Sequence, residues 1–197
     1  DSAQSFWTTE PDGDNISQGG AAGRLTNSRT IYTFIGSNPN NADLTASENS
    51  FDTINTAITT ALLGIDGEAN ADTLRTNLMN WTLGADTEND PANANHFFAD
   101  PLHSQPVVIT YGGTKDSPDA TVFLATNQGV LHAINTDTGD EEFAFIPQEL
   151  LSNLNYYYSD DEDIYKAYGL DGPIGHWFND LDGDGVLFDA GSTTLDS

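Results

Sequence analysis

The sequence contains no cysteine and very few basic residues. Its 197 residues include 31 Asp and Glu but only five Lys and Arg, which gives a formal net charge of −26. The lack of cysteine excludes disulfide bonds and thiol chemistry. The shortage of Lys and Arg argues against nucleic acid and anionic membranes as partners, because phosphate binding depends mainly on these side chains. The carboxylates favour cations, and a solvated acidic surface suited to salty surroundings accounts for part of the same charge.

Long apolar runs are also absent. No stretch of about 18 residues is apolar enough to suggest a membrane-spanning helix, and the N-terminus lacks the charged-then-apolar pattern of a signal peptide. The first and last residues of the sequence look like the middle of a longer chain, so we expect both ends to be cut. Its length suits one domain, or one domain with an appendage.

The first part of the chain, residues 1–95, reads as a lead-in with one strand and a helical hairpin. Residues 30–35 alternate between polar and apolar types and predict a strand. Apolar residues recur at helical spacing over 51–62. A second helical pattern follows the candidate N-cap Asp72 and ends before a glycine; its apolar face consists of Leu74, Leu78 and Trp81.

The second part, residues 96–197, has β character. Four short apolar runs separated by glycine turns predict an antiparallel sheet of propeller-blade type, with strands over 106–111, 121–126, 130–135 and 143–146. The predicted fold is therefore mainly β with a small helical lead-in.

The segment from Asp180 to Asp189 has the spacing of a calcium loop. Carboxylates occupy its positions one, three and five, and a glycine at position six permits a sharp turn. Calcium takes about six to eight oxygen ligands, whereas without a cation such carboxylates would repel one another and raise each other's pKa. We predict a calcium site formed by Asp180, Asp182, Asp184, the Val186 carbonyl and Asp189.

This loop is not a standard EF-hand. Position twelve is Gly191, where an EF-hand has a bidentate Glu, so we expect Asp189, at position ten, to be the substitute ligand. The alternative interpretation is an acidic, glycine-rich surface turn that binds nothing tightly.

Two sets of motifs resemble known families. Residues 122–139 are similar to the repeat of quinoprotein-type β-propellers: a strand ending in a small residue and Thr, a Gly turn, Leu-x-Ala in the next strand, and a turn ending in Thr-Gly. Residues 99–106, Ala-Asp-Pro-Leu-His-Ser-Gln-Pro, resemble the propeller entry of the PilY/PilC tip-adhesin family of type IV pili. Residues 145–151 (Phe-Ile-Pro-Gln-Glu-Leu-Leu) and 168–173 (Tyr-Gly-Leu-Asp-Gly-Pro) continue that resemblance in the same order.

The resemblance implies a calcium-dependent propeller at the pilus tip, outside the cell after export through the periplasm. It implies roles in pilus biogenesis, control of retraction and surface attachment. The implied partners are the remainder of the propeller, minor pilins, and a host or abiotic surface ligand.

Residues 96–197 hold material for about one and a half blades, whereas a propeller needs at least about four. We therefore expect a fragment of a longer adhesin or a unit completed by another chain. The alternative is a structural fragment of a generic secreted, calcium-stabilised propeller or surface-layer protein without a pilus role.

We expect no enzymatic activity. A quinoprotein dehydrogenase needs a complete ring of blades around its quinone. The four histidines lack the spacing of a zinc site, and Ser104 lacks the glycines of a nucleophile elbow. His132 lies within an alternating strand and is predicted to be a packed or an edge residue rather than a metal ligand or an acid–base group. The tyrosines at 156–158 either form a contact surface or pack beneath the acidic run 160–163.

Overall fold

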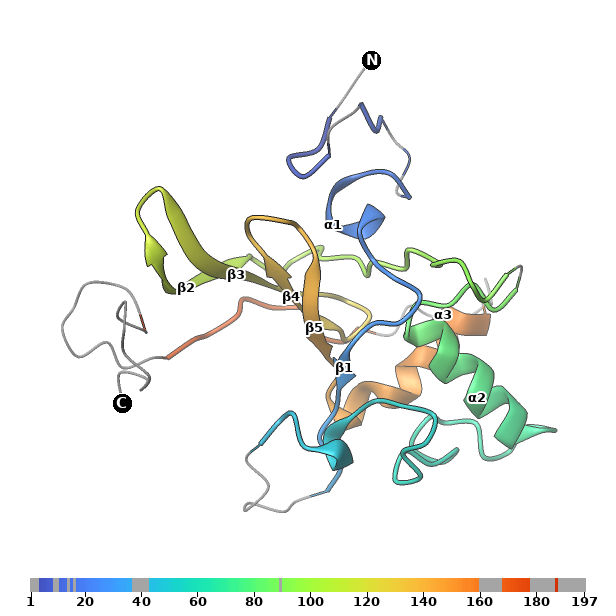
Figure 1. Cartoon of the computed structure of the whole chain (residues 1–197). Helices are drawn as coiled ribbons and strands as arrows, with labels where there is room; N and C mark the ends of the chain where they lie inside the picture. Colours follow the sequence, from blue (N-terminus) through green and yellow to red (C-terminus); the bar gives the residue numbers. More distant parts are fainter. Residues whose placement is uncertain are drawn as a thin grey trace.

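The structure is a computed structural model that describes residues 4–8, 11–13, 15, 17–36, 43–88, 90–159, 168–177 and 187. These residues form one five-stranded mixed sheet with helices packed beyond one end of it (Figure 1). The chain is therefore mainly β, as the sequence predicts. The elements in chain order are α1 (Gly20–Gly23), β1 (Ile31–Tyr32), the 3-10 helix η1 (Ser47–Asn49), α2 (Ala71–Thr82), β2 (Val107–Thr114), β3 (Ser117–Ala125), β4 (Leu131–Asn135), β5 (Glu141–Phe145), the 3-10 helix η2 (Gln148–Asn153) and α3 (Leu154–Ser159).

Strands β2 to β5 form an antiparallel meander, in the spatial order β5-β4-β3-β2. The four strands predicted from the apolar runs are confirmed. The first hairpin is longer than predicted, because β2 continues through Gly112 and Gly113 to Thr114 after a bulge. Glycine at 113 suits this position, since its φ is +89°. An antiparallel meander of four strands is the arrangement of one propeller blade.

A short strand from the lead-in completes the sheet. The predicted strand over 30–35 is found as β1, which pairs in parallel with β5, with Ile31 opposite Ala144 and Tyr32 opposite Phe145. Backbone bonds also join β1 to the segment after η1, from Phe51 N to the Ile31 carbonyl (2.8 Å). The lead-in and the meander thus share one hydrogen-bonded sheet.

Strand β4 is buried on both faces. Its residues His132, Ala133 and Ile134 are all buried, which is the pattern of a central strand with both faces covered. Ala133 lies opposite Phe123 of β3 and Phe143 of β5, and these two rings meet edge to face at 6.3 Å. The small residue at 133 leaves room for the rings on both neighbouring strands.

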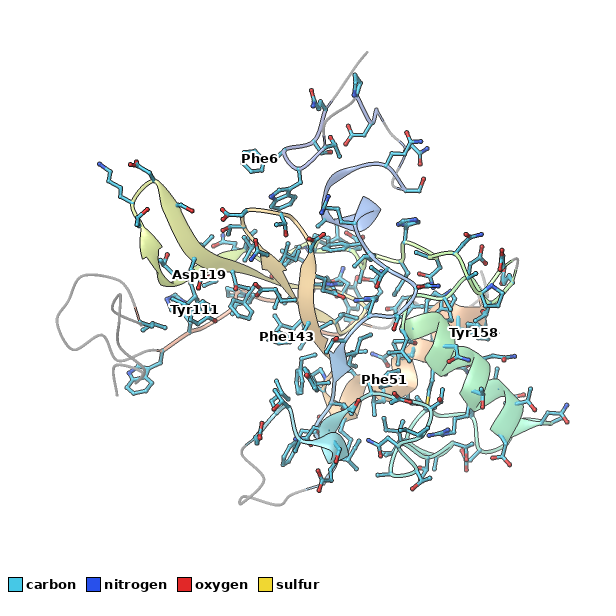
Figure 2. All side chains as sticks on the ribbon, in the orientation of Figure 1. Phe6, Phe51, Tyr111, Asp119, Phe143 and Tyr158 are labelled. Carbon is cyan, nitrogen blue, oxygen red and sulfur yellow. The ribbon has the colours of Figure 1, made fainter. Side chains whose placement is uncertain are left out.

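The main core lies between the β1–β5 end of the sheet and the helices. Its buried side chains come from β1, the loop 51–65, α2, η2 and α3, with contributions from β5 and the β3–β4 turn. Figure 2 shows Phe51 and Tyr158 on this side of the molecule, whereas Tyr111 and Asp119 lie on the β2–β3 hairpin. The members are Ile31, Phe51, Ile58, Leu63, Ile65, Leu78, Met79, Ala99, Val130, Ala144, Ile146, Leu151 and Leu154.

One of the two predicted lead-in helices is correct. The second helical pattern is found as α2, with Leu78 buried and Leu74 and Trp81 packed against the core. It begins one residue before the predicted N-cap, after Asn70, whose φ is +67°.

The first predicted helix is wrong, because residues 51–69 form turns. Three backbone carbonyls there accept hydrogen bonds from the Arg75 guanidinium, at 2.7 to 3.0 Å, and are unavailable to a helical ladder. Side chains of Asp52 and Asn55 also accept from backbone N–H groups two residues on. Such local hydrogen bonds compete with helix formation, so the helical spacing of apolar residues over 51–62 did not suffice to make this segment a helix.

The N-terminal segment packs on the β4–β5 turn. Trp7 donates its indole N–H to the Thr136 carbonyl (2.9 Å), and its ring lies against Gly139. Gly139 has a φ of +74°, and a Cβ there would come within 2.5 Å of the Trp7 ring. The Thr-Gly turn of the repeat is thus a docking point for the lead-in.

Candidate functional site

The predicted calcium ligands Asp180, Asp182, Asp184, Val186 and Asp189 lie outside the described residues. The calcium site therefore stays a prediction from the sequence. In the described part of the chain, no group of three His, Cys, Asp or Glu side chains is arranged to hold a metal ion.

The segments that carry the family resemblance meet at the β3–β4 turn. Asn127 donates its N–H to the carbonyl of Asp100 (2.9 Å), and the Asp100 N–H donates to the side chain of Gln128 (2.7 Å). The N–H of Leu170 donates to the Thr126 carbonyl (3.0 Å). Residues 99–104, 125–130 and 168–171 therefore form one structural unit, which we term the motif junction.

A contact between two side chains closes the motif junction on its exposed side. His103 Nδ1 lies 2.6 Å from a carboxylate oxygen of Asp171, although the two residues are 68 positions apart. Ser104 accepts a hydrogen bond from the N–H of Ala125 (3.2 Å), so its hydroxyl holds the turn in place. His103 and Asp171 thus fix the entry segment to the segment that leads toward the predicted calcium loop.

Close backbone approach explains two glycines of the motif junction. A Cβ at Gly169 would collide with the backbone of Gly129. A Cβ at Gly129 would lie 2.9 Å from Leu150, and the φ there is +87°. These glycines let the 168–171 segment lie directly on the β3–β4 turn.

A group of three buried side chains, which we term the buried centre, joins the lead-in to the sheet. Arg29 makes a bidentate contact with Glu141, with Nε at 2.7 Å and Nη2 at 2.8 Å from its two oxygens. His132 Nδ1 lies 2.6 Å from the same carboxylate. The three side chains are at most 5% exposed. Arg29 also donates to the Thr82 carbonyl at the end of α2 (3.2 Å), so the buried centre connects the lead-in, α2, β4 and β5.

The protonation states in the buried centre follow from burial and charge. Burial raises the pKa of Glu141, but the hydrogen bonds from His132 and Arg29 outweigh it and bring the pKa to about 2. Burial lowers the pKa of His132, and the hydrogen bond to Glu141 opposes this only partly. Glu141 is thus ionised and His132 neutral near pH 7, with Nδ1–H donating to Glu141. The other nitrogen, Nε2, is buried without a hydrogen-bond partner in the described structure.

Of the two predicted placements of His132, packed or at an edge, the structure shows the packed one. Its ring stacks on Phe98, with centroids 4.2 Å apart and planes 13° from parallel. Sequence reasoning missed the role of Arg29 and Glu141. The available signal was an arginine beside an apolar strand in a chain that has only five basic residues.

The three tyrosines at 156–158 differ in their packing. Tyr158 contacts Trp81 at 5.7 Å and Tyr157 contacts Phe97 at 6.4 Å, whereas Tyr156 is exposed. Two of the three therefore pack against the aromatic cluster beside α2. The acidic run 160–163 lies outside the described residues.

The helices in the described part of the chain are too short or too polar to span a bilayer. No protein family profile matches the sequence, and no solved structure is significantly similar. The chain is 35% identical over 65 residues to the type IV pilus biogenesis factor PilY1 of Pseudomonas aeruginosa (strain UCBPP-PA14). That match covers 33% of this chain and 6% of the relative, so it relates a limited segment of the chain to a pilus protein.

Proposed function

We propose that this chain is a calcium-binding segment of a type IV pilus tip adhesin, acting in pilus biogenesis, retraction control and surface attachment. The observation that carries the proposal is the 35% identity to a type IV pilus biogenesis factor. The motif junction supports it, because segments similar to the PilY/PilC family pack against one another rather than lying apart.

The meander β2–β5 supports a propeller as the wider architecture. It has the strand order of a blade, and its central strand is covered on both faces. The edge strand β2 has one neighbour among the described strands, β3. In the proposed protein, the remainder of the propeller and minor pilins are the partners of the chain.

Calcium is proposed as a structural cation for residues 180–189. Carboxylates at alternate positions are hard oxygen ligands, which suit calcium. Extracellular calcium modules bind with dissociation constants of about 10⁻⁴ to 10⁻³ M, so such a loop would be occupied outside the cell and empty inside it.

The pilus role is tested in the bacterium that makes the protein. Deleting the gene should remove most surface pili in electron micrographs and abolish twitching, and the wild-type gene should restore both. A deletion strain with normal pili and motility would contradict the pilus role and favour a generic secreted structural protein.

The role of calcium is tested by a separate complementation experiment. Complementation with Asp182→Ala/Asp184→Ala should restore fewer pili than wild type when calcium is limiting. Full restoration by this variant at low calcium would refute the need for the loop while leaving the pilus role intact. The matched control is Asp160→Ala/Asp161→Ala, which removes the same charge from the acidic run.

A further inference from the structure

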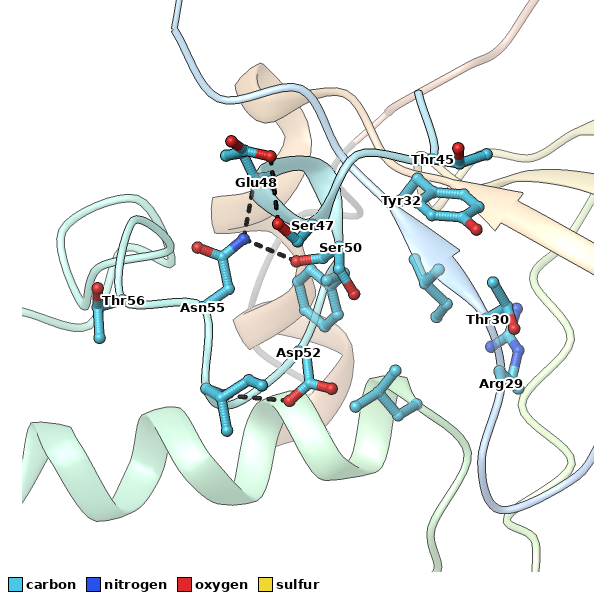
Figure 3. Close-up of a pocket in the computed structure, with 14 residues that line it drawn as sticks. Arg29, Thr30, Tyr32, Thr45, Ser47, Glu48, Ser50, Asp52, Asn55 and Thr56 are labelled. Atoms are coloured by element: carbon cyan, nitrogen blue, oxygen red, sulfur yellow. Dashed lines mark hydrogen bonds between the residues drawn. The ribbon is translucent and has the colours of Figure 1, made fainter. Parts of the chain in front are cut away.

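A hollow of about 700 Å³ lies between β1 and the loop 45–56 (Figure 3). Tyr32 and Thr45 lie on one side of it, and Glu48 and Asn55 lie on the other. None of the residues that line the hollow belongs to the motif junction.

The side-chain nitrogens that line the hollow are already engaged. Asn55 Nδ2 donates to the carbonyls of Glu48 (3.0 Å) and Ser50 (2.7 Å). The Arg29 guanidinium, whose side chain is 3% exposed, is held by Glu141 and the Thr82 carbonyl. These lining side chains therefore offer no free cation or amide N–H to an anionic ligand.

Carboxylate oxygens, in contrast, remain available. Glu48 is exposed, and its carboxylate accepts a hydrogen bond from one described residue, Ser47, at 3.3 Å. Asp52 accepts from the N–H of Ile54 (3.0 Å) and from Thr53 (3.4 Å), both through Oδ1, and no described residue donates to its Oδ2. A ligand that fits these oxygens carries hydrogen-bond donors and positive charge.

The hollow also has apolar surface next to the carboxylates. Ile54 is 84% exposed, and Leu83 and the half-buried ring of Tyr32 complete this surface. Lysine and arginine bury an aliphatic stem on such surface while their charged end reaches acceptors, and a tyrosine ring attracts the cation further. We propose that this hollow binds a lysine or arginine side chain presented by a partner protein.

Charge complementarity favours a different protein over a second copy as the source. Two copies of the chain carry −26 each and repel one another. The three arginines already have partners within the chain, and Lys115, at the tip of the β2–β3 hairpin, is the exposed described cation outside those contacts. A partner with a basic surface has no such repulsion to overcome.

The test uses capped tripeptides titrated into the whole chain and followed by NMR. A peptide with a central lysine should bind saturably and shift signals of the 45–56 loop. A norleucine-centred peptide, which keeps the stem and lacks the charge, should bind about tenfold more weakly or worse, because a charged hydrogen bond contributes about 1.5–3 kcal/mol. Equal binding of the two peptides, or no saturable binding of the lysine peptide, would overturn the proposal.

Paired variants locate the site. The variant Glu48→Gln/Asp52→Asn should bind the lysine peptide about tenfold more weakly than wild type, or worse. It should still fold, because the amide oxygen introduced at position 52 can accept the hydrogen bond from Ile54; thermal unfolding checks this. The control Asp66→Asn/Glu68→Gln removes the same charge from exposed positions outside the hollow and should change affinity by less than about twofold, since exposed charges are screened by salt.

Two results would overturn the assignment. An equal loss of affinity in the control variant would show general attraction to an acidic chain. Self-association of the wild-type chain in sedimentation that Lys115→Gln abolishes would identify a second copy as the occupant. A monomeric wild type with a loss confined to the Glu48 and Asp52 variant supports the proposal.

Discussion

The buried centre and the predicted calcium loop differ in how the negative charge of their carboxylates is balanced. In the buried centre, a single carboxylate, Glu141, receives hydrogen bonds from Arg29 and His132 within the fold. In the loop, carboxylates recur at alternate positions of a chain with a net charge of −26. One group is neutralised from inside the protein, and we predict that the other binds a cation from outside.

The use of the basic residues explains this difference. Arg24 pairs with Asp140, Arg29 with Glu141, and Arg75 donates to three backbone carbonyls. Lys115 lies at a hairpin tip, and Lys166 lies outside the described residues. The described arginines are thus committed to structure, so they leave most of the acidic side chains without an arginine partner among the described residues.

The largest effect is expected from breaking the buried centre. Arg29→Met removes the main cation of Glu141 and leaves that carboxylate buried, which should lower the free energy of unfolding by about 3–5 kcal/mol. Urea denaturation of the variant and the wild type measures this difference.

A second variant separates lost charge from lost packing. Arg29→Met/Glu141→Leu removes both charges and should recover a large part of the loss, because apolar replacement of a buried pair is often close to neutral. A double variant as unstable as the single one would show that the charges are not the cause.

Acid should weaken the buried centre in two steps. The folded-state pKa of His132 lies below its ordinary value of 6.5, so the unfolded chain takes up a proton first and stability falls as the pH drops below that value. The pKa of Glu141 falls from 4.5 to about 2, so its contribution, on the order of 3 kcal/mol, is lost between those values. Urea unfolding from about pH 8 to pH 4 should show the first step, and His132→Gln should flatten it. A wild-type curve that is flat between about pH 7 and pH 5 would contradict this assignment.

The smallest effect is expected at the surface. The Arg24–Asp140 contact is 2.7 Å long, but both side chains are more than one third exposed. Arg24→Gln should therefore cost less than about 1 kcal/mol, and added salt should reduce the difference. A loss comparable to that of Arg29→Met would show that exposure does not separate the two pairs.

The sequence predicted the meander better than the lead-in. Strands such as β4 and β5 follow from local alternation and glycine turns, which are readable from neighbouring residues. The loop 51–65 could not be predicted in this way, because the Arg75 side chain, far along the chain, takes up the carbonyls that a helix would use.

The same limit applies to the sites. The contact between His103 and Asp171 spans 68 residues, and that between Arg29 and Glu141 spans 112. Sequence motifs identified the segments of the motif junction, but spacing alone could not reveal which side chains meet. The predicted calcium loop is local in sequence, so its ligand set could be proposed from spacing alone.

The most direct test is a calorimetric titration of calcium into the metal-stripped chain, with magnesium as the control cation and thermal unfolding followed in parallel. We expect saturable, calcium-selective binding, with about 2.7 kcal/mol of added stability when calcium reaches about 100 times its dissociation constant. Asp182→Ala/Asp184→Ala should abolish both effects, and Asp160→Ala/Asp161→Ala should retain them. Absence of binding to the wild type, or wild-type affinity in the Asp182 and Asp184 variant, would contradict the claim that this loop takes its cation from solution.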